Sequence, residues 1–281
     1  MRELAEFRVD EQFAPMLFTE REGKRLGSSV RKVEIETSDP RYEQVGRLQF
    51  ELTAKQGKPF FYGWELRRQY TKAELVTADL FSLRVTAVFE PAGEERGTKY
   101  DESSSCPNCA AGAKQIGPLI LDVKRIPKGK DIAKTIAGEI VVSRRVVELL
   151  EQHGITGVAP NPVRMSAASS AESKDWFQLI VRSTDAEIAA PTRVGNNPFD
   201  DDPQDEGRCS LGDLLGLNLL SEVTIRAMTR GDADFVSTRQ FIGVRRGLLR
   251  PERVILISPK VWKLIESEKL KGVEVEIARL A

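Results

Sequence analysis

The stretches VVSRRVVELLEQHGITGV (residues 141–158) and LISPKVWKLIESEKLKGV (residues 256–273) carry the same pattern of residues twice. They align without a gap at a constant offset, which for the serines is 258 − 143 = 115 residues. Two unrelated amphipathic helices can share apolar positions by chance, but serines and glycines matched in register favour an internal repeat. The identical pairs include Ser143/Ser258, Val146/Val261, Leu149/Leu264, Glu151/Glu266, Gly157/Gly272 and Val158/Val273.

Each copy begins as a short apolar strand that ends at a serine, whose oxygen can accept from the first free N–H groups of a helix. In the second copy Pro259 suits the first helical position, where its missing N–H is not needed. Val146, Leu149 and Leu150 fall at i, i+3 and i+4 and form one apolar stripe. The glycine past the helix turns the chain towards the next strand. The sequence therefore predicts one strand–helix–strand unit twice, within an α+β protein.

A cysteine motif stands ahead of each copy. CPNC contains Cys106 and Cys109, and RCSLGD contains Cys209, with Gly212 where a second cysteine would stand and Asp213 after it. A zinc ribbon is built from two such turns, whose four ligands form a tetrahedron around the ion. The sequence predicts a zinc-ribbon-like site with three thiolate ligands.

The fourth ligand is open at this stage: it is Asp213, it is His153, or it is missing. His153 is the only histidine, but its place near the end of the repeated helix is common for histidine. The pair Cys106 and Cys109 could also be a redox CxxC or two surface thiols without a role. Serines before the pair and small residues after it suit a knuckle better. We expect a structural role for the metal, with a site that has lost its ion as the alternative.

The chain has 281 residues, and its 42 basic and 42 acidic side chains give no net charge. Such a protein has no global field that would draw it onto nucleic acid or an anionic membrane. No apolar run approaches the roughly 20 residues that cross a bilayer. The N-terminus lacks a secretory signal, and three cysteines do not suggest a disulfide framework. We expect a soluble, cytoplasmic protein that does not bind membranes.

The first part of the chain is expected to be a β-rich domain over residues 1–95, followed by an α+β domain over residues 96–281. Residues 33–37, 46–52 and 80–91 alternate apolar and polar positions or are rich in β-branched and aromatic residues, as strands are. Residues 90–105 and 195–207 are polar, contain glycine and are predicted to be loops.

Nothing in the sequence indicates catalysis. A single histidine disfavours most serine and cysteine triads, and no phosphate-binding glycine loop or nucleophile elbow is present. Carboxylates are dense in one polar run, which is typical of a solvated acidic loop rather than of opposed catalytic groups. Its members are Asp200, Asp201, Asp202, Asp205 and Glu206. We expect that the protein is not an enzyme.

The chain also contains a basic stretch, TRQFIGVRRGLLRPER (residues 238–253). Such a stretch can contact phosphates, but in a neutral protein its arginines are expected to pair with carboxylates. The arginines are Arg239, Arg245, Arg246, Arg250 and Arg253.

Residues 100–281 resemble myxobacterial immunity-type proteins, which are related to the double-CxxCG family and to bacterial polymorphic-toxin immunity proteins. The segments that carry this resemblance are CPNCAAG, RCSLGDLLGLNLLSE and the two repeat copies with their flanks. In that family the cysteine motifs look like zinc knuckles, which Cys106, Cys109 and Cys209 match. The second pair is incomplete in this chain.

The resemblance implies a stoichiometric inhibitor that binds and neutralises a cognate protein toxin. The acidic run would then face a basic cleft of the toxin. Phe61 and Trp64 would be hydrophobic anchors; they belong to a cluster of aromatic residues, Phe60, Phe61, Tyr62 and Trp64. One alternative is a zinc-ribbon module that binds nucleic acid through the basic stretch, and a second is a structural subunit of a larger assembly. The sequence leaves the oligomeric state open.

Overall fold

The computed structural model describes residues 1–168, 170–199, 208–209, 211–216 and 218–281. The chain divides into two compact units. Unit 1 comprises Met1–Val76 and Asn197–Asp201, and unit 2 comprises Thr77–Asn196 and Asp202–Ala281. The division after Val76 precedes the expected boundary near residue 95, because the strands over residues 81–89 pair with strands of unit 2. Helices and strands are mixed in the chain, which confirms the α+β class.

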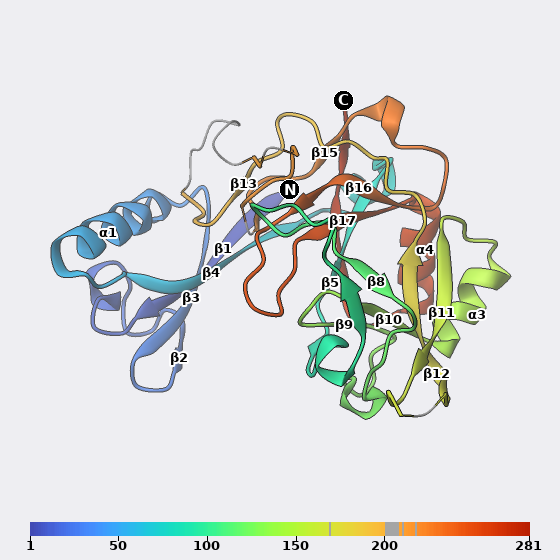
Figure 1. Cartoon of the computed structure of the whole chain (residues 1–281). Helices are drawn as coiled ribbons and strands as arrows, with labels where there is room; N and C mark the ends of the chain where they lie inside the picture. Colours follow the sequence, from blue (N-terminus) through green and yellow to red (C-terminus); the bar gives the residue numbers. More distant parts are fainter. Residues whose placement is uncertain (169, 200–207, 210, 217) are drawn as a thin grey trace. The chain divides into compact units, whose positions relative to one another are not determined.

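Unit 1 is an antiparallel sheet of order β2-β3-β1-β4 with one long helix, α1 (Figure 1). Its core is mostly aromatic and aliphatic, with Phe7, Phe60 and Val45 fully buried. The elements are β1 (Arg2–Asp10), η1 (Ala14–Met16), β2 (Lys24–Leu26), β3 (Val30–Glu36), α1 (Arg41–Gln56), β4 (Phe61–Gln69) and, across the boundary, α2 (Lys72–Thr77).

The strand predicted over residues 46–52 is wrong, because these residues belong to α1. Val45 and Leu52 are buried at helical spacing, whereas Phe50 is 76% exposed. The apolar residues at every second position resembled a strand, but the chain forms a helix here. One stripe of this helix is buried, and Phe50 lies outside that stripe. Gly57 caps the C-terminus of the helix: it has a left-handed φ of 65°, and its N–H donates to the Thr53 carbonyl.

Unit 2 contains the predicted repeat, and the order of the strands shows how its copies correspond. The first copy has the order β9-β10-β12-β11, and the second has β16-β17-β5-β18. Strand β5, from an early part of the chain, thus occupies in the second copy the place that β12 occupies in the first. The first copy comprises β9 (Ile132–Thr135), β10 (Ile140–Ser143), α3 (Arg144–Gln152), β11 (Val158–Arg164) and β12 (Glu172–Val181). The second comprises β16 (Phe235–Ile242), β17 (Glu252–Ile257), α4 (Pro259–Glu268), β18 (Val273–Ile277) and β5 (Phe81–Val85).

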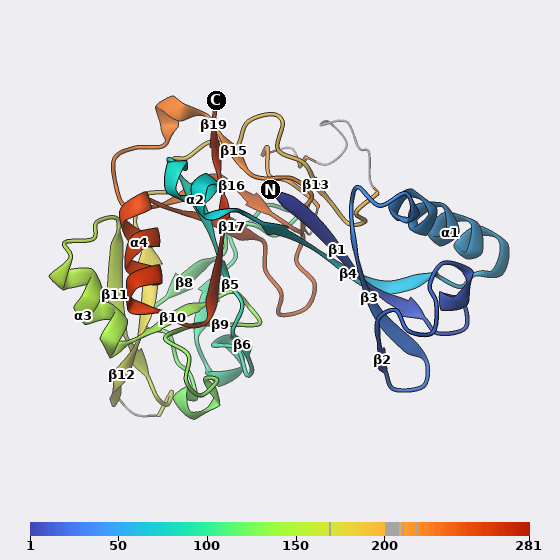
Figure 2. The same ribbon diagram turned by 180° about the vertical axis from the view of Figure 1, so that it is seen from behind.

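The serine caps of both copies are present. Ser143 and Ser258 each accept a hydrogen bond of 3.4 Å from the backbone N–H three residues on, at the start of α3 and α4. The two helices lie on the same side of unit 2, as both views show (Figures 1 and 2). These local predictions from the sequence are confirmed.

The matched glycines join the copies to each other. Gly157 and Gly272 have φ of 88° and 105°, a region that favours glycine. A Cβ on Gly157 would overlap the carbonyl oxygen of Phe235, the first residue of β16, and a Cβ on Gly272 would overlap that of Ile132, the first residue of β9. Each copy therefore approaches the opening strand of the other so closely that no side chain fits.

Short elements complete unit 2. The strands are β6 (Val88–Phe89), β7 (Lys99–Asp101), β8 (Lys114–Ile116), β13 (Val194–Gly195), β14 (Asn218–Leu219), β15 (Thr224–Ile225) and β19 (Arg279–Leu280). The 3-10 helices are η2 (Glu94–Arg96), η3 (Val123–Arg125) and η4 (Ala227–Thr229). Among the described residues, no helix combines the length and apolar character that a membrane span requires.

Candidate metal centre

The three cysteines come together from two distant parts of the chain. Cys106 and Cys109 lie in the connection between β7 and β8, and Cys209 lies 100 residues beyond Cys109 (209 − 109 = 100). All three are buried, and their sulfur atoms all lie within 4.8 Å of one another. The predicted convergence of the two cysteine motifs is confirmed.

The first motif forms a turn that aims backbone N–H groups at sulfur. The Cys106 N–H donates to the Ala111 carbonyl at 2.8 Å, and the Ala110 N–H donates to the Cys106 carbonyl at 2.8 Å. Backbone N–H groups of Cys109 and Asn108 donate to the Cys106 sulfur and lower the pKa of this thiol. Ala110 has a φ of 60°, which is uncommon for a residue with a Cβ. This turn is suited to a thiolate.

The second motif forms a similar turn that is one residue shorter. The Cys209 N–H donates to the Asp213 carbonyl at 2.9 Å, and the Leu211 N–H donates to the Cys209 sulfur at 3.4 Å. Gly212 has a φ of 86°. In each turn, a residue with left-handed φ stands directly before the residue whose carbonyl accepts the cysteine N–H. This residue is Ala110 in the first turn and Gly212 in the second. Gly212 therefore corresponds to Ala110 and not, as the sequence suggested, to the second cysteine. The second cysteine of this turn is absent rather than replaced.

Asp213 brings a carboxylate to the cysteines. It is 8% exposed, and its Oδ2 lies 3.7 Å from the Cys109 sulfur and 3.6 Å from the Cys209 sulfur. Its Oδ1 accepts the backbone N–H of Phe241 at 2.9 Å, which fixes the orientation of the carboxylate. Among the described residues, the set of ligand atoms that all lie within 4.8 Å of one another contains the three thiols only. Asp213 therefore contacts two of the three thiols from the edge of that set.

His153, the other candidate for the fourth ligand, lies elsewhere. It is the exposed residue that caps the C-terminus of α3, and it lines a groove with Lys260, Lys263 and other residues of α4. It does not belong to the group of close ligand atoms found among the described residues. Asp213 is thus the predicted fourth ligand that the fold brings to the cysteines.

The donor set fits a tetrahedral zinc ion. With Zn–S of about 2.3 Å and Zn–O of about 2.0 Å, a regular tetrahedron has S···O edges of about 3.5 Å and S···S edges of about 3.8 Å. The distances from Asp213 to Cys109 and Cys209 lie close to that edge. Burial, with the neighbouring thiols, raises the pKa of Cys109 to about 12. A cation would be needed to keep all three sulfurs ionised.

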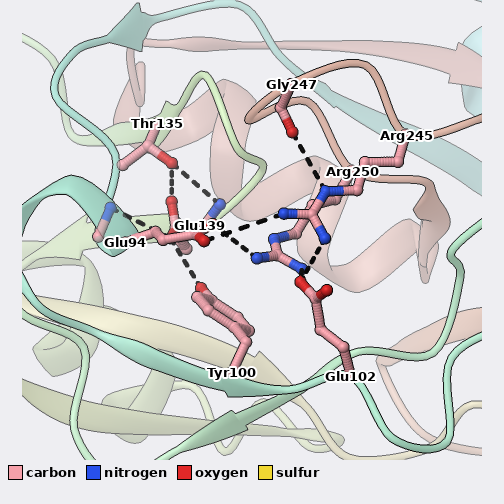
Figure 3. Close-up of polar contacts among 9 residues, drawn as sticks. Glu94, Tyr100, Glu102, Thr135, Glu139, Arg245, Gly247 and Arg250 are labelled. Carbon is pink, nitrogen blue, oxygen red and sulfur yellow. Dashed lines mark hydrogen bonds and ion pairs between the residues drawn. The ribbon is translucent and has the colours of Figure 1, made fainter.

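The connection between β16 and β17 packs against the first turn. The Arg245 backbone N–H donates to the Cys109 carbonyl at 3.0 Å, and the Arg245 side chain pairs with Glu102 (Figure 3). Arg250 pairs with Glu94 at 2.7 Å and with Glu102 at 3.1 Å, and its guanidinium lies 4.1 Å from the centre of the Tyr100 ring. The two cations therefore hold this connection to Glu102, which directly follows β7, and Arg250 also ties it to Glu94.

The expected pairing of the basic stretch with carboxylates is confirmed for Arg245 and Arg250. Arg253 instead donates to backbone carbonyls, including that of Thr238 at 2.5 Å, and stacks over Phe241. The side chains of Arg239 and Arg246 are exposed. Three of the five arginines are thus engaged inside unit 2.

A buried carboxyl lies beside these ion pairs. Glu139 is 7% exposed, and its Oε1 accepts from the Tyr100 hydroxyl at 2.7 Å and from the Gly93 N–H at 3.2 Å, while Thr135 contacts the other oxygen (Figure 3). Burial raises the pKa of Glu139. The sequence analysis missed this group, because a single glutamate between two short strands gives no signal of a partner 39 residues away.

The structure describes two of the predicted partner-binding residues, Phe61 and Trp64. Phe61 is 5% exposed and lies in the core of unit 1, and Trp64 is partly buried against that core. The prediction that Phe61 is a surface anchor is therefore wrong, because the pleat of β4 turns Phe61 inwards. For Trp64, which keeps part of its surface exposed, the role of an anchor stays a prediction. The acidic residues Asp200, Asp201, Asp202, Asp205 and Glu206 lie outside the described residues.

Neither a scan against protein-family models nor a search of curated proteins yields a match for this chain.

Proposed function

We propose that the chain holds one structural zinc ion through Cys106, Cys109 and Cys209, with Asp213 as the fourth ligand, and that it acts as a binding protein rather than as an enzyme. One observation carries this proposal: three buried thiols from two distant segments lie within 4.8 Å of one another. The contact of the Asp213 carboxylate with two of these thiols supports it.

A structural role follows from the donor set. Three thiolates and one carboxylate fill a tetrahedron and leave no open position for a substrate or an activated water. The two turns and the β16–β17 connection meet at the cysteines, through contacts such as that of Arg245 with Cys109. A bound ion would therefore cross-link segments that are far apart in sequence, as structural zinc sites do.

Cobalt substitution tests this proposal directly. Co²⁺ bound by three thiolates in a tetrahedron gives intense thiolate charge-transfer absorption together with visible bands of tetrahedral Co²⁺. We expect both in the wild-type chain and a weaker charge-transfer band in Cys209→Ser. Octahedral cobalt bands without charge transfer would refute the site.

For the partner we propose a bacterial protein toxin, as the resemblance of residues 100–281 to immunity-type proteins implies. A closed metal centre, which has no open position for a substrate, supports a binding role over a catalytic one. Co-expression with toxic proteins encoded beside the chain tests this: restored growth and a stoichiometric complex are expected. Failure to protect against each of these neighbours would overturn this part of the proposal and leave the zinc site standing.

The nucleic-acid alternative predicts binding that weakens steeply with salt. It is disfavoured because Arg245, Arg250 and Arg253 already have partners within unit 2. A structural subunit would instead appear as a constitutive oligomer of this chain with other proteins.

A further inference from the structure

A short segment that follows β13 packs into the aromatic core of unit 1. The Phe199 ring lies 4.7 Å from the centre of the Tyr42 ring, 6.0 Å from that of Phe7 and 6.4 Å from that of Phe61. Phe7 and Phe61 are buried, whereas Phe199 is partly exposed. An aromatic side chain from a part of the chain more than a hundred residues beyond Val76 thus covers the aromatic face of unit 1.

Helix α1 has a gap where this ring sits. A Cβ on Gly46 would lie 2.7 to 3.1 Å from atoms of the Phe199 ring, so a side chain at this position would collide with it. Glycine within a helix is unfavourable relative to alanine. The helix therefore carries an unfavourable residue at the one point where its absent side chain makes room for the phenylalanine.

The residue before the phenylalanine is held as well. Pro198 is buried, and its carbonyl accepts a hydrogen bond from the Tyr42 hydroxyl at 3.3 Å. Proline restricts the backbone before the aromatic side chain, which lowers the entropy lost when the segment binds. Together, Tyr42, Gly46, Phe7 and Phe61 receive the proline–phenylalanine pair, and we call this receiving surface the aromatic groove.

We propose that the aromatic groove is a peptide-binding site, that Asn197–Phe199 is its resident occupant, and that a partner protein binds by presenting a proline–phenylalanine loop in place of this segment. The site lies in unit 1 and does not depend on the zinc centre proposed above. Phe61, expected from the sequence to be an exposed anchor, is here part of the wall that receives one. Aromatic anchors in fitted pockets dominate binding at many protein interfaces.

A resident segment competes with a peptide in trans, because its tether gives it a high effective concentration. The probe is a fluorescein-labelled peptide with the sequence of residues 195–203, GNNPFDDDP. Its binding to the full chain is followed by fluorescence anisotropy. We expect Phe199→Ala, which vacates the groove, to bind the peptide at least tenfold more tightly than the wild type. The same peptide with alanine in place of phenylalanine should not bind.

Two further variants locate the binding. In the Phe199→Ala background, Gly46→Val should abolish binding because its side chain fills the groove, and Glu43→Ala, an exposed change on the same helix, should leave binding unchanged. Equal and weak binding by the wild type and Phe199→Ala, or binding that survives Gly46→Val, would overturn the proposal.

Pro198→Gly provides a test that leaves the aromatic core intact. It changes only the resident segment, whose backbone it loosens, so this segment should compete less well and the peptide, which keeps its proline, should bind more tightly than to the wild type. If Phe199→Ala fails to fold, this variant decides: no gain in peptide affinity would refute the proposal. The zinc content of these variants should equal that of the wild type, which separates this site from the metal centre.

Discussion

Asp213 uses its two carboxylate oxygens for different contacts. Oδ1 accepts the Phe241 N–H, and Oδ2 faces the sulfurs of Cys109 and Cys209. A carboxylate that is already oriented by the backbone is well placed to bind a metal ion. The hydrogen bond that orients Asp213 comes from the backbone of Phe241, so the cysteine motifs in the sequence give no sign of it.

Asp213→Asn tests the role of the fourth ligand. The amide oxygen can still accept from Phe241, but the negative charge towards the metal is lost. Zinc affinity should fall by about tenfold or more, since even indirect ligand contacts are worth that much. Competition with a chelator measures the affinity, and Asp232→Asn, an exposed change, serves as the control. Equal affinities in both variants would remove Asp213 from the site.

Ala110 is a residue whose backbone conformation affects the free energy of unfolding. Its φ of 60° lies in the left-handed region, which costs alanine free energy because its Cβ comes too close to the backbone. Ala110→Gly should therefore raise the free energy of unfolding by about 0.5–1 kcal/mol, after the larger entropy of glycine in the unfolded chain is subtracted. Chemical denaturation measures this. The adjacent buried Ala111→Gly should instead destabilise, so a loss in both variants would contradict the account.

At the scale of elements, the repeat could be predicted because its signals are local. A capping serine, an apolar stripe and a terminal glycine lie within eighteen residues of one another, and the structure has each of them. The strand expected over residues 46–52 was wrong because alternation over seven residues is compatible with either period. The exchange of β12 for β5 in the second copy could not be predicted, because strand order depends on contacts that no local pattern records.

The paired glycines give a prediction for the repeat. Gly157→Ala should destabilise the protein by about 2 kcal/mol or more, because the new methyl overlaps the Phe235 carbonyl and the φ is left-handed. Gly272→Ala should behave alike. Gly154→Ala is the matched control: its φ is 55°, but nothing lies within 4 Å of the new Cβ, so only about 1 kcal/mol is expected. Thermal or urea unfolding that ranks the three variants equally would contradict the close approach.

At the scale of the whole molecule, the stability of unit 2 should depend on buried polar groups that lie far apart in sequence. Arg250 reaches Glu94 across 156 residues, and Tyr100 reaches Glu139 across 39. The sequence indicated that the basic stretch would find carboxylates, but not which ones. More of the cysteine centre could be predicted, since a cysteine pair and a matching lone cysteine in a chain with so few cysteines suggest that they share one site.

Glu139 predicts a pH dependence. Its pKa is raised in the fold, so between the unfolded value near 4.5 and the folded value the native state binds the extra proton. The free energy of unfolding contributed by Glu139 therefore falls as the pH rises through that window. Glu139→Gln removes this slope: the stability of the wild type relative to the variant should decrease from pH 4.5 upwards. Denaturation at several pH values checks this, and a difference that is constant or increases would refute the assignment.

The central claim is that two cysteine motifs a hundred residues apart form one metal site. The most direct measurement is the zinc content of the purified full chain, determined beside Cys209→Ser. The account predicts one zinc per wild-type chain and loss of that zinc in the variant, although CPNC itself is unchanged. A wild-type chain that takes up no zinc under reducing conditions, or a variant that retains a full equivalent, would contradict it.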